Sequence, residues 1–269
     1  MYNEKPIISK WIADLYDQKV TETEDVEFLL SVIGQTPKRI LEVCCGSGRI
    51  LVPLSKAGHI VSGFDADGFM LAKISAKAEG LTNIQWRAAD AVRDDWGTGF
   101  DFVVLFGNIL YNIVSDMDYA KSQEMFIRKA ASALDPGGCV CIEYSPGGFC
   151  LANPNYVPDV SGDKTDWVVW DGTDNDGNYG RMILLGGGHY DKDTRLSRFT
   201  RRFELTLRNG EKIEQDISCV KHFASLEQVH GWLNDAGFTV GQQYADFDRS
   251  PINDSSTRAI IIARKGARQ

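Results

Sequence analysis

Short hydrophobic runs alternate with amphipathic stretches along the chain as far as Ser145. Five of these runs are rich in Val, Ile, Leu and Phe and lack regular alternation with polar residues, as strands buried on both faces do. They are Arg39–Val43, Ile60–Phe64, Ile84–Arg87, Phe100–Phe106 and Cys139–Tyr144. Helical periodicity lies between them, over Arg49–Ala57, Gly68–Glu79 and Ser122–Leu134. This alternation predicts βα units that share one parallel sheet.

Two helices are predicted before the first strand, and a different pattern follows Ser145. The helices are Ile8–Gln18 and Thr23–Ile33. Later runs alternate hydrophobic and polar positions, which predicts an inserted antiparallel sheet of three or four strands. These runs are Trp167–Trp170, Arg181–Tyr190, Leu196–Leu207 and Lys212–His222. The Asn209-Gly210 pair predicts a two-residue hairpin turn between the last two runs.

The end of the chain returns to the first pattern. Ser225 and Gln228 form a capping box that opens a helix ending at Gly237. Strands are predicted over Phe238–Ala245 and Thr257–Arg264. Because no helix separates these two strands, the last one does not fit a right-handed parallel crossover. The predicted fold is therefore a doubly wound, seven-stranded α/β sheet of the Rossmann-like kind, with the last strand antiparallel and an antiparallel sheet inserted after the fifth strand.

Composition and charge narrow the range of functions. The chain has 29 Lys and Arg against 37 Asp and Glu, a net charge of −8, and a pI near 5.1. A net acidic surface repels phosphate backbones, so we expect no nucleic-acid partner. The sequence shows neither a long apolar run nor a hydrophobic leader, so we expect no membrane association. The six cysteines lack the spacing of a zinc site, which indicates reduced thiols in a cytoplasmic protein without a bound metal.

Polar residues and glycines follow the predicted strand ends. Gly46 and Gly48 come after the first strand, where glycine allows a tight turn and lets a ligand lie against bare backbone. Asp65 follows the second strand, at a position where a carboxylate accepts hydrogen bonds from ribose hydroxyls. Asp90 follows the third strand, where an acid can accept from an adenine amine, and Asn108 follows the fourth. Open α/β sheets bind ligands at these carboxyl ends, so one ligand site is predicted.

With this ordered set of motifs, the chain resembles the class I S-adenosylmethionine-dependent methyltransferases of the small-molecule type. The matching segments are Leu41–Arg49, Asp65, Ala89–Ala91, Phe106–Asn108 and Leu134–Gly138. The resemblance implies that Gly46 and Gly48 face the amino-acid portion of the cofactor and that Asp65 faces its ribose. It implies that Asp90 and Ala91 meet the adenine.

Further cofactor residues follow from the same resemblance. Met70 is expected to pack against the adenine ring, and Tyr16 is expected to belong to a lid over the cofactor. The other residues assigned to the cofactor are Glu42, Cys44, Ala66 and Asn108. The family usually has glycine at the position of Cys44, which is a departure in this chain.

The resemblance also implies a domain layout and a reaction. Residues 1–36 form a helical lid, residues 37–147 and 223–269 form the S-adenosylmethionine-binding core, and residues 148–222 form a substrate-side region. The implied reaction is an in-line transfer of the methyl group to an amine or hydroxyl of a small-molecule acceptor, which releases S-adenosylhomocysteine.

Two alternatives stay open. One is an NAD(P)-dependent oxidoreductase, although Leu51 stands at the third glycine of that fingerprint. The other is a cofactor-binding protein without catalysis. A homodimer and a monomer are both compatible with the sequence.

Candidates for proton transfer are few, since methyl transfer needs a base only when the acceptor arrives protonated. Tyr111 and His189 are the predicted catalytic residues, with a core tyrosine and a structural histidine as the alternatives.

Glu143 is either a polar site residue or a solvated strand end. The arginines of 195–202 meet an anionic substrate or form a solvated sheet face. The segment Asp171–Gly177 has part of a calcium-loop spacing, but the pattern favours a polar hairpin turn.

Overall fold

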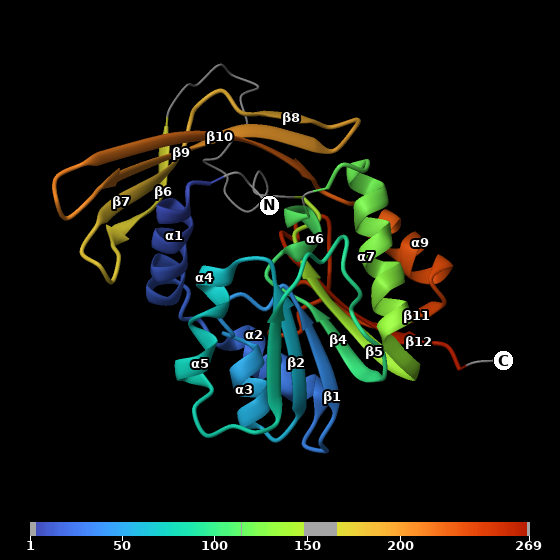
Figure 1. Ribbon diagram of the computed structural model, residues 1–269. Coiled ribbons are helices and arrows are strands. Elements are labelled where there is room, and N and C mark those ends of the chain that lie inside the picture. The colour runs from blue at the N-terminus through green and yellow to red at the C-terminus, as the bar shows by residue number, and fades with distance from the viewer. Residues whose placement is uncertain (1–3, 114, 148–165, 268–269) are drawn as a thin grey trace. The chain divides into compact units, whose positions relative to one another are not determined.

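A computed structural model describes residues 4–113, 115–147 and 166–267 of the chain (Figure 1). The chain forms two compact units, which we describe separately. The α/β unit comprises Glu22–Ala152 and Ala224–Gln269, and the β unit comprises Met1–Thr21 and Asn153–Phe223. Within the described residues, no helix is long and apolar enough to cross a membrane.

The α/β unit is built on a seven-stranded sheet with the order β11-β12-β5-β4-β1-β2-β3. Its strands are β1 (Arg39–Val43), β2 (Ile60–Asp65), β3 (Ile84–Ala88), β4 (Phe100–Leu105), β5 (Leu134–Tyr144), β11 (Phe238–Tyr244) and β12 (Ala259–Lys265). Strands β1 to β5 pair in parallel, whereas β12 runs antiparallel to both β5 and β11. This topology confirms the predicted fold class and the antiparallel last strand.

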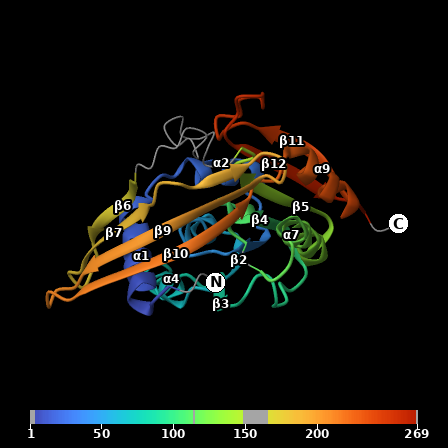
Figure 2. The ribbon, with the colours of Figure 1, turned by 90° about the horizontal axis from the view of Figure 1, so that it is seen from above.

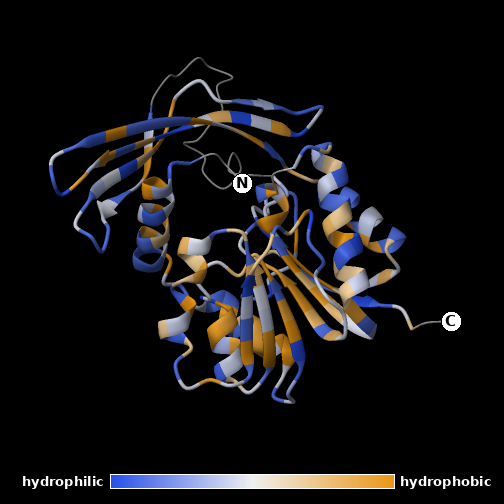
Figure 3. Cartoon of the chain, viewed as in Figure 1, coloured by the Kyte–Doolittle hydropathy of each residue, from blue (hydrophilic) through white to orange (hydrophobic). Residues whose placement is uncertain are grey.

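Helices cover both faces of this sheet (Figure 1). They are α2 (Glu24–Ile33), α3 (Leu51–Lys56), α4 (Gly68–Leu71), α5 (Ile74–Lys77), α6 (Ile109–Asn112), α7 (Tyr119–Ala133) and α9 (Leu226–Asp235). Leu41 and Val140 point to the side of α7 and α9, while Ile40 and Cys141 point to the side of α2 and α3. The central strands are therefore hydrophobic on both faces, which Figure 3 shows in their colouring. This explains why their sequences lack alternation.

Two local features of the α/β unit differ from the predicted bounds. The helix expected over Gly68–Glu79 is divided into α4 and α5, because the N–H of Lys73 donates to Met70 at 3.0 Å in a tighter, three-residue step. Strand β5 already pairs at Leu134, where a stop and turn were expected. The pairing then skips from Leu134 to Cys139, so the expected turn is present as an irregularity within the strand.

The β unit combines an antiparallel sheet with one helix, α1 (Pro6–Lys19). The strands in its described residues are β6 (Trp167–Thr173), β7 (Tyr179–Leu184), β8 (His189–Asp191), β9 (Leu196–Thr206) and β10 (Lys212–His222). Their order is β10-β9-β7-β6, and β8 pairs with β9. The expected run Arg181–Tyr190 is therefore two strands, because three consecutive glycines at 186–188 interrupt it.

Helix α1 packs against this sheet (Figure 2). Its buried residues Ile8, Trp11 and Leu15 share one face of the helix. Trp11 donates from Nε1 to the carbonyl of Gly172 at 3.1 Å. A Cβ at Gly180 would lie 2.6 Å from the Trp11 ring, so the strand must be bare there. The compact units thus place α1 with the inserted strands and α2 with the α/β core, whereas the sequence grouped both helices in residues 1–36.

The turns of the β unit account for two motifs noted in the sequence. The hairpin between β9 and β10 has a three-residue loop, since the N–H of Leu207 donates to Glu211 and Gly210 adopts φ +87°. The predicted two-residue turn is therefore wrong by one residue, and the loop is the glycine-ended type. In the segment resembling a calcium loop, Asp174 accepts hydrogen bonds from the backbone N–H groups of Asp176 and Asn178, which makes it a polar hairpin turn.

Candidate cofactor site

The turn after β1 brings bare backbone to the edge of the sheet. Cys44, Gly46 and Gly48 all adopt positive φ, at +57°, +53° and +79°. A Cβ at Gly48 would lie 3.1 Å from a side-chain carbon of Ile74, so this position is tightly packed. A Cβ at Gly46 would meet nothing within 4 Å. The turn therefore leaves open space at Gly46, while Cys44 adopts a left-handed conformation that glycine adopts with less strain.

Asp65 connects the end of β2 to this turn. Its carboxylate accepts a hydrogen bond from the N–H of Gly46 at 2.9 Å and another from the N–H of Asp67 at 2.8 Å. Burial raises the pKa of the Asp65 carboxyl, and these two backbone donors oppose that rise. Asp67 in turn caps α4 by accepting from Phe69 and Met70, as its position predicted.

Glu42 is a buried carboxyl in the last part of β1, with an exposed fraction of 5%. Its Oε2 atom has no hydrogen-bond partner among the residues that the structure describes. Burial raises its pKa well above the usual value, although the charge of Arg49 lowers it in part. Arg49 itself forms a two-pronged ion pair with Asp25, at 2.8 Å and 2.5 Å, which ties α2 to the turn.

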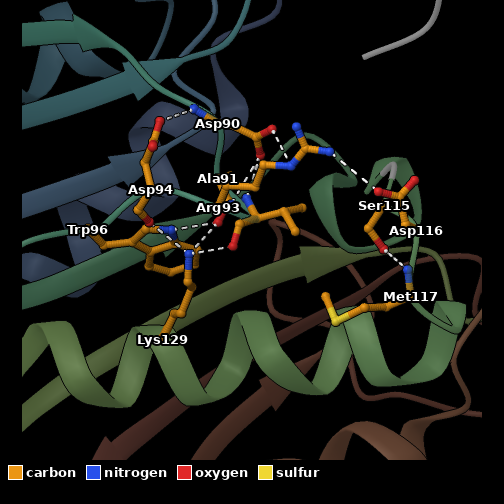
Figure 4. Close-up of polar contacts among 10 residues, drawn as sticks. Asp90, Ala91, Arg93, Asp94, Trp96, Ser115, Asp116, Met117 and Lys129 are labelled. Atoms are coloured by element: carbon orange, nitrogen blue, oxygen red, sulfur yellow. Dashed lines mark hydrogen bonds and ion pairs between the residues drawn. The ribbon is translucent and has the colours of Figure 1, made fainter.

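The loop after β3 contains the two residues assigned to the adenine, Asp90 and Ala91. The Oδ1 atom of Asp90 accepts from the N–H of Val92 at 2.8 Å and from that of Arg93 at 3.3 Å. The carbonyl of Ala91 accepts from the indole of Trp96 at 2.9 Å (Figure 4). These contacts fold the loop back on itself and leave Oδ2 of Asp90 with a long, 3.9 Å ion-pair contact to Arg93.

The turn after β4 is fixed by a buried acid. Asn108 adopts φ +58°, and its side-chain oxygen accepts from the N–H of Ser145 at 2.8 Å. Glu143 accepts from the N–H groups of Gly107 and Asn108, both at 3.0 Å, and pairs at 3.2 Å with Arg258, the residue before β12. Burial raises the pKa of the Glu143 carboxyl, while these donors and the guanidinium lower it. Glu143 is therefore a buried, paired acid and not a solvated strand end, whereas a role toward the substrate stays a prediction.

The α/β unit holds most of the predicted site residues at this edge. Helix α6 begins directly after Asn108, and Tyr111 lies half-buried within it. Met70 lies half-buried in α4. Ala66 is exposed in the turn between β2 and α4. The turns after four parallel strands end at one edge, so these residues gather from segments far apart in the sequence.

Tyr16 and His189 belong to the β unit instead. Tyr16 contacts the ring of Trp170 edge-on, with ring centres 6.3 Å apart. His189 is exposed in the short strand β8. Of the neighbouring arginines, Arg202 of β9 pairs with Asp216 of β10 at 2.8 Å. That pair agrees with a solvated sheet face, whereas the roles of Tyr16 and His189 stay predictions.

Two supporting residues were missed by the sequence reasoning. Lys129 of α7 donates to carbonyls of the loop after β3, and Arg258, just before β12, pairs with Glu143, which accepts from the turn after β4. A lysine or arginine on an amphipathic element is usually solvated, and nothing in its neighbours indicated a distant partner. In the described residues, no group of acidic, histidine and cysteine side chains has metal-binding geometry.

Comparisons with known proteins agree with this geometry. Residues 40–138 match the family model of a methyltransferase domain. A putative methyltransferase of Geobacillus sp. is 23% identical over 232 residues, which cover 86% of each chain. The CcbJ methyltransferase of Streptomyces caelestis has 19% identity and a TM-score of 0.70, over 96% of this chain and 98% of that one. CalS10 of Micromonospora echinaspora, an amino pentose methyltransferase solved with S-adenosylmethionine bound, has 14% identity and a TM-score of 0.62, over 94% and 96%.

Proposed function

We propose that the chain, whose residues 40–138 match a methyltransferase domain, is an S-adenosylmethionine-dependent methyltransferase that methylates an amine or a hydroxyl of a small polar acceptor and releases S-adenosylhomocysteine. The observation that carries the proposal is the hydrogen bond between Asp65 and the N–H of Gly46. It joins the glycine turn to the acid that the family uses for the ribose. When bound, the cofactor supplies a methyl group on a positively charged sulfur.

The residues at the sheet edge suit each part of this cofactor. The open space at Gly46 accommodates a ligand against bare backbone. Each carboxylate oxygen has two acceptor positions, so Asp65 can hold ribose hydroxyls while keeping its bonds to Gly46 and Asp67. A buried carboxyl with one unpartnered oxygen, Glu42, suits the ammonium of the amino-acid portion, because a cation would favour its ionised form.

Adenine recognition is assigned to the loop after β3. Asp90 uses Oδ1 for the loop itself, which leaves Oδ2 as the acceptor for the exocyclic amine. Ala91 is the neighbouring backbone position, and Met70 of α4 offers an apolar surface to the ring. The oxidoreductase alternative gains no support from this edge, because Leu51 begins α3 and is fully buried where a dinucleotide fingerprint needs glycine.

The acceptor class follows from chemistry and from the relatives. CalS10 is an amino pentose methyltransferase, which supports an amine-bearing small molecule as the acceptor. An amine attacks only as the free base, so a proton must leave the acceptor before or during the transfer. Tyr111, in α6, and His189, in β8, are the residues proposed to accept this proton or to orient the acceptor.

The test is an assay with S-adenosylmethionine that carries a deuterated methyl group and a panel of amino sugars, small amines and hydroxyl compounds. The proposal predicts release of S-adenosylhomocysteine together with a matching mass increase on an acceptor. Oxidation or reduction of a substrate with NAD(P)H, and no methylated product, would instead support the oxidoreductase. Cofactor binding without turnover across the panel would support the non-catalytic alternative.

A further inference from the structure

We propose that Lys129, on α7, is a positioning residue that sets the conformation of the adenine-binding loop after β3. The inference rests on the proposed function, because the loop is taken to hold the adenine. The inference is based on hydrogen bonds between the Lys129 ammonium and three backbone carbonyls of the loop, which Figure 4 shows.

The ammonium of Lys129 donates to three backbone carbonyls. These belong to Ala91 at 2.9 Å, Val92 at 2.8 Å and Asp94 at 2.7 Å. A lysine ammonium has three N–H donors, so all of them are used within one short segment. An exposed lysine without a structural role rarely places all three donors on backbone.

Lys129 and Asp90 hold the same peptide groups from opposite sides. In the Ala91–Val92 peptide, the carbonyl accepts from Lys129 and the N–H donates to Oδ1 of Asp90. In the next peptide, the carbonyl of Val92 accepts from Lys129 and the N–H of Arg93 donates to the same oxygen. Each of these two peptide planes is therefore fixed between a cation and an anion, which also fixes the direction of the Asp90 carboxylate.

The surroundings strengthen this role. The Lys129 ammonium lies 5.6 Å from the ring centre of Trp96, a buried residue whose indole shares the Ala91 carbonyl. Asp90, Asp94 and Asp95 stabilise its charge, although burial lowers the pKa of Lys129. The loop residues Val92–Asp95 lie outside any helix or strand, so polar contacts decide their conformation.

The consequence concerns recognition of the base. Without Lys129, the carbonyls of Val92 and Asp94 lose this donor and that of Ala91 keeps only the Trp96 indole, so the peptide planes that donate to Asp90 are no longer held from the opposite side. A displacement of about 1 Å at a binding group is enough to lose much of its contribution. Lys129 does not touch the adenine in this account, so its loss should reduce discrimination between bases and not simply weaken every ligand equally.

The experiment compares two ligands by calorimetry on the full chain. The ligands are S-adenosylhomocysteine and S-inosylhomocysteine, in which a carbonyl oxygen replaces the exocyclic amine. We expect Lys129→Met to bind S-adenosylhomocysteine about ten-fold or more weakly and to lose most of the preference for adenine, because the loop loses hydrogen bonds from a charged group. Lys121→Met, an exposed lysine of the same helix, is the matched control and should behave as the wild type.

The outcomes separate this inference from the proposed function. Wild-type affinity and wild-type base preference in a folded Lys129→Met variant would overturn the role of Lys129 alone. Failure of the wild type to bind S-adenosylhomocysteine would overturn the proposed function, and this inference with it. If Lys129→Met does not fold, Lys129→Gln is measured instead, since its amide can still donate to two carbonyls. An intermediate base preference in that variant supports the inference, and an unchanged one overturns it.

Discussion

The carboxylate of Asp65, at the end of β2, accepts a hydrogen bond from the N–H of Gly46, in the turn after β1, at 2.9 Å. These residues are 19 positions apart, and they meet because β1 and β2 are parallel neighbours. The bond joins the acid that we propose to bind the ribose to the glycine turn. A substitution of either residue should therefore change the conformation of the other.

Asp65→Ala should weaken binding of S-adenosylhomocysteine by about 1.5–3 kcal/mol, the cost of losing hydrogen bonds to a charged group. Calorimetric titration measures this loss, and circular dichroism checks that the variant is folded. Asp67→Ala is the control, because Asp67 caps α4 without an assigned cofactor contact. Equal affinity losses in the two variants would argue against a specific role for Asp65.

Gly46→Ala should abolish most of the cofactor affinity, because its Cβ enters the open space at the turn. Gly58→Ala is a matched control: Gly58 also has a positive φ, +94°, and a Cβ there also meets nothing within 4 Å. Both variants should lose about 1–2 kcal/mol of folding free energy through left-handed backbone strain. Only Gly46→Ala should lose affinity in calorimetry, and a similar loss in Gly58→Ala would contradict the assignment.

Tyr111→Phe and His189→Gln test the proton-transfer proposal. A general base typically contributes about 10²- to 10⁴-fold to the rate, so the variant of the true base should lose kcat on that scale with little change in cofactor affinity. Wild-type kcat in both variants would show that the acceptor arrives deprotonated or that another group serves as the base.

His59 predicts an acid-sensitive fold. The ring is buried at 1% exposure, between α3 and β2, and neither nitrogen has a hydrogen-bond partner among the described residues. Burial lowers its pKa below the ordinary value of 6.5. The unfolded chain therefore binds a proton at His59 at a higher pH than the folded protein does. Uptake of this proton favours unfolding, so the protein keeps its full stability above pH 6.5 and loses stability as the pH falls below that value.

The measurement compares urea unfolding of the wild type and His59→Gln between about pH 7.5 and 5.5. The wild type should lose stability relative to the variant on acidification, by at most about 1.4 kcal/mol per pH unit for one proton. The other histidines are common to both proteins, so their contributions cancel in the difference. A difference that is independent of pH would show that His59 accepts its proton as readily when folded.

The fold was largely predictable because the information for it is local. Runs such as Arg39–Val43 and the capping box at Ser225 predict their elements from neighbouring residues alone, and both are present as expected. The break between β7 and β8 was less visible, although its three glycines are a local signal. The division of residues 1–36 was not predictable, since whether α1 packs on one sheet or another depends on contacts such as Trp11 with Gly172.

The candidate site shows the same limit. Glycines and acids at strand ends were predictable because parallel strands bring their carboxyl ends to one edge. The groups that hold them were not, since Lys129 reaches its partners across 35 to 38 sequence positions. Arg258, which lies just before β12, pairs with Glu143 of β5, 115 positions earlier in the chain. A single sequence records which side chains are present, but not which distant backbone groups they satisfy.

The most direct test of the account is calorimetric titration of S-adenosylhomocysteine into the purified protein, with NADH titrated in parallel. The account predicts one-to-one binding of S-adenosylhomocysteine in the micromolar range and no binding of NADH. Binding of NADH, or the absence of any binding of S-adenosylhomocysteine, would contradict the assignment of the edge around Gly46 and Asp65 as the cofactor site.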